Sequence, residues 1–167
     1  MTKTYLYSVI FVMATIAFST ACTDSGEDFD HNSLYSSWER VQYHEDHELN
    51  YVATLEFKRD GTYERSTKFR NPDTDALVGY IHFEEGTISL DGENIDFIPT
   101  RYLFIGHEAF WGPFEELQEW EINTVSQPAT STLEYREGGS NLAIFTPCND
   151  ILSSFCVPTQ VYTRVNR

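Results

Sequence analysis

Basic residues are scarce in this chain. Its 167 residues include 11 Lys and Arg against 26 Asp and Glu, and the formal net charge is −15. Because nucleic-acid phosphates are bound by clusters of Lys and Arg, and the few bases here are scattered through acidic stretches, we expect no nucleic-acid partner. The acidity suits a basic protein partner, or it serves only to keep an exported protein soluble.

Catalytic motifs are also missing. The sequence has no Gly-x-Ser-x-Gly nucleophile elbow and no glycine-rich loop for a phosphate. His82 and His107 have no recognisable nucleophile beside them. The acidic pairs 84–85 and 115–116 are adjacent residues, which face apart on a strand. We therefore expect a protein that is not an enzyme and that uses no cofactor.

The densest group of potential metal ligands is the segment YHEDHEL. It contains His44, Glu45, Asp46, His47 and Glu48. The zinc-protease motif needs two histidines four apart on a helix, whereas these two are three apart and would face apart on a strand. We interpret the segment as a solvated hairpin loop and expect no metal, with a zinc or copper site as the alternative.

One uncharged stretch, residues 5–21, follows Lys3 and ends in small residues. A membrane-spanning helix needs about 20 predominantly apolar residues, whereas the core of an export signal needs about 7 to 15 and ends at small residues. Thr15, Ser19 and Thr20 make this stretch too short and too polar for a span. Residues 1–21 are therefore predicted to be a cleaved export signal, with a permanent transmembrane anchor as the alternative.

The end of this stretch, Ser19, Thr20, Ala21 and Cys22, resembles the signal of bacterial lipoproteins. In that family, small residues precede a cysteine that is acylated before cleavage, usually with Leu three places before it. The resemblance implies that Cys22 carries fatty acyl chains such as palmitate, and two or more chains hold a protein lastingly at a membrane. Because Thr23 follows instead of Asp, it also implies residence in the outer membrane of a bacterial cell envelope.

Three cysteines would leave one unpaired in an exported protein. Lipidation of Cys22 accounts for the odd one. Cys148 and Cys156 can then form a structural disulfide across a short segment, as an oxidising compartment allows. A metal pair or two free thiols are the alternatives.

Residues 22–32 are acidic and have almost no apolar content, which predicts a flexible tether. Residues 33–167 then form a single domain of ordinary size. Their short runs alternate between apolar and polar residues, as half-buried strands do, and helical periodicity is nearly absent.

The strands are expected to pair as an antiparallel meander. Residues 51–57 place every second side chain on one face, Asp60 and Gly61 supply a hairpin turn, and residues 62–69 return. Further strands are expected over residues 36–43, 77–83, 87–90, 95–105, 120–126, 131–137, 141–147 and 157–165, with turns at 85–86, 91–92 and 138–140. Because every connection is too short for a helical crossover, we predict an all-β fold of nine or ten strands, a barrel or a sandwich.

The segment 106–118 interrupts this pattern. It is too long for a hairpin turn and brings Phe110, Trp111 and Phe114 close together. We expect either a lid or short helix over the mouth of a barrel, or aromatic side chains that plug one end of the core.

Four segments, LYSSWERV, LEFKRDGTYE, GYIHFEEGTISLDGENIDF and VYTRV, resemble the lipocalin-like domains of small bacterial lipoproteins. The likeness covers residues 33–167. Ser36 and Ser37 stand before Trp38, where true lipocalins have a Gly-x-Trp signature. The resemblance implies that the antiparallel meander closes into a small barrel with an apolar cavity.

The predicted fold is compatible with two alternative functions. The first is a non-catalytic binding module whose inward residues line a pocket for a small apolar ligand. The residues expected to line it are Trp38, Leu55, Phe57, Tyr63, Tyr80 and Trp120. The second is an interaction module with a solid core, whose acidic outer face docks a basic partner in the envelope. An eight-stranded barrel is just wide enough for either.

Overall fold

A computed structural model describes residues 29–121, 130–147 and 159–165. The predicted signal over residues 1–21, the lipid-attachment site Cys22 and the predicted disulfide between Cys148 and Cys156 lie outside the described residues. These three assignments therefore stay predictions.

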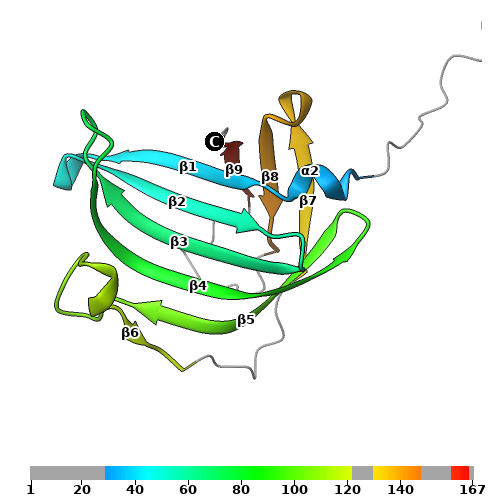
Figure 1. The fold of residues 1–167 in the computed structure, drawn as a ribbon. Coiled ribbons are helices and arrows are strands. Elements are labelled where there is room, and N and C mark those ends of the chain that lie inside the picture. The colour runs from blue at the N-terminus through cyan, green and yellow to red at the C-terminus, as the bar shows by residue number, and fades with distance from the viewer. Residues whose placement is uncertain (1–28, 122–129, 148–158, 166–167) are drawn as a thin grey trace, which may run out of the picture.

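Within the described residues, nine antiparallel strands form one sheet (Figure 1). The strands are β1 (Ser37–His44), β2 (Leu49–Phe57), β3 (Thr62–Arg70), β4 (Leu77–Asp91), β5 (Asn94–Phe104), β6 (Gln118–Glu119), β7 (Ser131–Arg136), β8 (Asn141–Phe145) and β9 (Thr159–Arg164). Short helical turns are α2 (His31–Leu34), η1 (Glu45–His47), η2 (Phe114–Glu116) and η3 (Glu137–Gly139). The prediction of an all-β antiparallel meander is confirmed. None of the helices in this part of the chain is long and apolar enough to cross a membrane.

The hydrogen bonds run in a ring of eight strands, with β6 added at the edge of β5. The ring is not a regular barrel, because its joints between β1 and β9 and between β5 and β7 contain two residue pairs each. Figure 1 shows β1 to β5 as a broad curved sheet, with the shorter β7, β8 and β9 standing against one end of it. The predicted closure into a barrel is therefore confirmed only as a ring of hydrogen-bonded strands.

The hairpin of β2 and β3 follows the alternation in the sequence. Tyr51 pairs with Phe69, and Phe57 pairs with Tyr63, so the predicted antiparallel pairing is confirmed. Gly61 has a φ of 83°, a left-handed conformation that glycine adopts without strain. The Asp60 carboxylate accepts a hydrogen bond from the backbone N–H of Thr62 at 3.0 Å, which closes the turn.

The predicted turn at residues 85–86 is wrong, because β4 continues through it. The pairing of β4 with β5 instead shifts by one residue between Glu85 and Gly86. A Cβ atom on Gly86 would lie 2.2 Å from the carbonyl oxygen of Ile98. Glycine is therefore needed here for the close approach of two strands, a requirement that has the same sequence signature as a turn.

Substitution of Gly86 by Ala is expected to lower the free energy of unfolding by about 2 kcal/mol, because the added methyl forces two backbones apart. Urea denaturation measures the change. Ser89→Ala, at an exposed position of the same strand, is the control and should change stability little. A Gly86→Ala protein as stable as the wild type would show that β4 and β5 do not approach as described.

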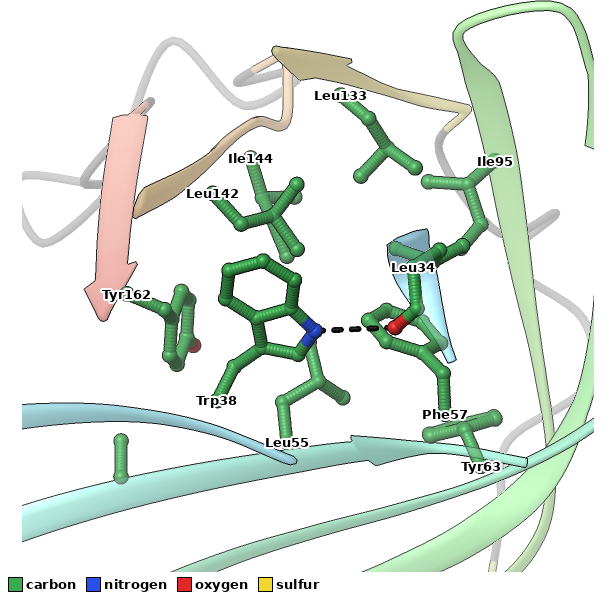
Figure 2. Packing of buried hydrophobic residues seen from close by; sticks show 11 residues of the cluster. Leu34, Trp38, Leu55, Phe57, Tyr63, Ile95, Leu133, Leu142, Ile144 and Tyr162 are labelled. Carbon is green, nitrogen blue, oxygen red and sulfur yellow. Dashed lines mark hydrogen bonds between the residues drawn. The ribbon is translucent and has the colours of Figure 1, made fainter. Parts of the chain in front are cut away.

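The apolar core fills one end of the ring, which is called the closed end below, and the opposite end is called the open end (Figure 2). The Trp38 indole lies among side chains from several strands, and its N–H donates to the backbone carbonyl of Leu34 at 3.0 Å. Asp30 caps α2 by accepting from the backbone N–H of Asn32, and the Phe29 ring stacks on Tyr135 at 4.5 Å. Residues 29–32, assigned to the tether from the sequence, therefore pack against the domain.

Candidate functional site

The six residues predicted to line a pocket do not all lie together. Four of them belong to the core cluster and are at most 2% exposed: Trp38, Leu55, Phe57 and Tyr63. They pack against one another at the closed end. Trp120, by contrast, is 50% exposed and contacts the Phe104 and His107 rings. The role of these six residues in ligand binding remains a prediction.

Tyr80 lies on the opposite, convex face of the sheet. The pairing of β3 with β4 shifts between Thr67 and Lys68, so Tyr80 is placed opposite Lys68 instead of following the inward alternation of His82. Its ring contacts Phe114 with centroids 5.4 Å apart. A bulge of this kind reverses the direction of every side chain beyond it, and strict alternation in the sequence does not reveal it.

The inward side of the curved sheet, on which Trp38 and Leu55 lie, is called the concave face. From the packed core to the open end, the side chains on this face are mostly polar. By their register with Trp38 and Leu55, these inward residues are Arg40, Gln42, Tyr51, Arg65, Thr67, His82, Glu84, Tyr102 and Tyr162. The sequence-based choice of pocket residues selected them mainly for their apolar and aromatic character. The polar half of the face was therefore missed.

An ion pair joins β3 and β4 in the middle of this face. One Arg65 amino group (Nη2) donates to both oxygens of Glu84, at 2.7 and 2.9 Å, and the Tyr63 hydroxyl donates to the same carboxylate at 2.5 Å. Glu84 is 7% exposed, while the Arg65 side chain keeps 38% of its surface accessible. Burial, followed by the hydrogen bond to Glu84, raises the pKa of Tyr63 far above its usual range. The carboxylate is thus buried with three donated hydrogen bonds, and the guanidinium borders open space.

His82 lies beside this pair. Its Nε2 is 3.4 Å from the Thr67 hydroxyl, and its ring stacks on Tyr102 with centroids 5.8 Å apart. Burial, followed by the charge of Arg65, lowers the pKa of His82 from 6.5 to about 4. The imidazole is therefore neutral at pH 7.

The neutral His82 makes stability depend on pH. Between pH 6.5 and pH 4 the unfolded chain takes up a proton at this residue that the folded chain does not, so stability falls as the pH falls. We expect a loss of about 2 kcal/mol from His82 over this interval, after allowance for its partial exposure. Urea denaturation at several pH values should show a flatter profile for His82→Gln. His107→Gln, at an exposed position, should keep the wild-type slope, and an unchanged slope in His82→Gln would contradict the assignment.

A hollow of about 500 Å³ lies at the open end of this face. It is lined by Arg40, Gln42, Tyr43, His44 and Tyr51. The guanidinium of Arg40 lies 5.9 Å from the centroid of the Tyr162 ring, which comes from β9. Burial raises the pKa of the Tyr162 and Tyr102 phenols, so both are protonated at neutral pH.

The segment 106–118 spans the edge of the sheet at the open end. The backbone N–H of Tyr80 donates to the carbonyl of Gly112 at 2.7 Å, and the N–H of Gly112 donates back at 3.0 Å. On one side of this bridge Trp111 packs against the inward Phe69 at 5.0 Å, and on the other Phe114 contacts the convex Tyr80. Trp111 therefore borders the open end of the concave face, while Phe110 is 74% exposed.

The segment YHEDHEL forms the hairpin loop between β1 and β2, as predicted. The His44 and His47 rings stack at 4.7 Å, and His47 contacts Trp111. Over residues 29–121, 130–147 and 159–165, no group of three or more His, Cys, Asp or Glu side chains could hold a metal ion. Comparison of the chain with protein-family models and with curated proteins finds no match.

Proposed function

We propose that this chain is a non-catalytic binding module of the bacterial cell envelope, in which a lipocalin-like domain receives a small ligand on its concave face. The observation that carries the proposal is the division of that face into a packed apolar end and an open end with a hollow. The hollow has a volume of about 500 Å³ and is widely open to solvent, so a ligand bound there would stay partly exposed. Aromatic rings beside convergent polar groups, as at Tyr51 and Arg40, are typical of small-molecule sites.

The ionisable groups on this face favour binding over catalysis. Glu84 is held by Arg65 and Tyr63 and is not free to act as a base. A histidine with a pKa of about 4 is a weak base at neutral pH, so the contact between His82 and Thr67 would activate the hydroxyl poorly.

The place where the chain joins the domain supports attachment through Cys22 to the outer membrane. Phe29 and α2 pack at the closed end of the ring, and Cys22 precedes Phe29 by only a few residues (Figure 1). An acyl anchor at Cys22 would therefore join the domain at the end opposite the hollow. The hollow would then remain accessible to molecules in the surrounding compartment.

Native mass spectrometry of the protein purified from membranes tests the proposal. We expect a polypeptide that begins at an acylated Cys22 and retains a small molecule. In the Gln42→Trp variant the new indole fills the hollow, so at least about tenfold less of that molecule should be retained, which corresponds to about 1.4 kcal/mol of binding free energy.

Val41→Trp is the matched control, because Val41 is the neighbouring residue on the convex face and is 53% exposed. It should retain the molecule like the wild type. A wild-type protein that is always empty, and whose binding partner is a basic protein released by salt, would contradict the proposal and favour the docking alternative.

A further inference from the structure

The charge on the concave face opposes the charge of the chain. The protein carries a formal net charge of −15, yet two guanidinium groups face inward, that of Arg65 in the middle of the face and that of Arg40 toward the open end. Glu84 is the inward carboxylate of the described strands β1 to β5. The other carboxylates within these paired strands alternate to the convex face, and they are Glu39, Glu56, Glu64, Glu85, Asp91 and Asp96. Because Glu84 balances Arg65, Arg40 is the remaining charge on the inward side of these strands, while the loop after His44 carries the carboxylates of Glu45, Asp46 and Glu48.

Of these two inward guanidinium groups, that of Arg40 is the one without a carboxylate partner. Glu84 is bound by Arg65 through two hydrogen bonds and by the Tyr63 hydroxyl, and within the described residues no salt bridge includes Arg40. The Arg40 Nε is buried and has no hydrogen-bond partner. Because this Nε has almost no exposed surface, a ligand acceptor would have to bind the terminal amino groups of the same guanidinium.

The surroundings of Arg40 restrict what such a ligand can be. The hollow places Arg40 beside the Tyr51 ring, and Tyr51 contacts the Phe69 ring at 5.8 Å. The planar fork of a guanidinium matches the two oxygens of a carboxylate, while the Tyr51 ring, held in place by Phe69, can contact a flat apolar group.

We infer that the hollow binds a small organic carboxylate, with the carboxylate on Arg40 and the apolar part against the Tyr51 ring. This inference rests on the proposed function and adds the chemical class of the ligand. The guanidinium of Arg40 is the charged group that lines the hollow, so it would select an anion over an uncharged molecule of the same shape.

Isothermal titration calorimetry of the full chain in a nonionic detergent tests the inference with two probes. One is 2-naphthoate, which carries a carboxylate, and the other is 2-naphthylmethanol, which has the same rings and no charge. We expect 2-naphthoate to bind at least about tenfold more tightly, as the loss of one charge-assisted hydrogen bond predicts. Arg40→Gln should remove this preference, with an unchanged urea midpoint as the check on folding.

Arg59→Gln is the matched control, because it removes one positive charge from an exposed turn between β2 and β3. It should bind 2-naphthoate like the wild type. Equal binding of both probes, or an Arg40→Gln protein that keeps the preference, would overturn the inference and leave the proposed function standing. Failure of both probes to bind would also overturn the inference, whereas the proposed function is decided by the native mass spectrometry described above.

Discussion

Substitution of Trp38 by Ala is expected to lower the free energy of unfolding by about 3 to 5 kcal/mol. The side chain is fully buried at the closed end, and it packs against residues from β2, β8 and β9. Its loss leaves a cavity and removes the hydrogen bond from the indole N–H to the Leu34 carbonyl, which ties α2 to the sheet. Urea denaturation followed by far-ultraviolet circular dichroism measures the change.

Trp120→Ala is the control for this prediction, because it removes the same side chain from a position that is 50% exposed. It should change stability by less than about 1 kcal/mol, as substitutions at exposed positions usually do. If Trp38→Ala cost no more than Trp120→Ala, the apolar core would not lie where the structure places it.

Substitution of Glu84 by Gln is expected to cost about 3 kcal/mol. The variant keeps the shape of the side chain but removes the negative charge that Arg65 and the Tyr63 hydroxyl require. Breaking one partner of a buried ion pair costs about 3 to 5 kcal/mol, and the lower figure applies because Arg65 is 38% exposed and partly solvated.

Glu85→Gln is the matched control one residue away. Glu85 points to the convex face, and its distance to Arg101 is 3.6 Å, with both side chains exposed (38% and 45%), whereas Glu84 is buried. Exposed ion pairs contribute about 0 to 1 kcal/mol, so this variant should be nearly as stable as the wild type. Equal losses in Glu84→Gln and Glu85→Gln would contradict the inward direction of Glu84.

The meander and one face of it were predictable from the sequence for a simple reason. Side chains alternate on a strand, so Leu55, Phe57 and Tyr63 could be assigned to one face before any pairing was known. Two local features broke the rule. The bulge before His82 turns Tyr80 outward, and the close approach at Gly86 resembles a turn in sequence, so both depend on the partner strand.

The candidate site was less predictable than the fold. The pair of Arg65 and Glu84 joins residues 19 positions apart, and it exists only because β3 and β4 adopt one register. Choosing inward residues by hydrophobicity selected the packed core instead. The lack of a carboxylate partner for Arg40 could not be predicted from the sequence either, because it depends on which face the carboxylates of five strands occupy.

A crystal structure of the protein purified from the membranes of the cell that makes it would test the central claim most directly. The account predicts electron density for a small molecule in the hollow, with oxygen atoms within hydrogen-bond distance of Arg40 and a flat group beside Tyr51. Density showing side chains of the protein itself filling the hollow, with Arg40 paired to one of its own carboxylates, would contradict it.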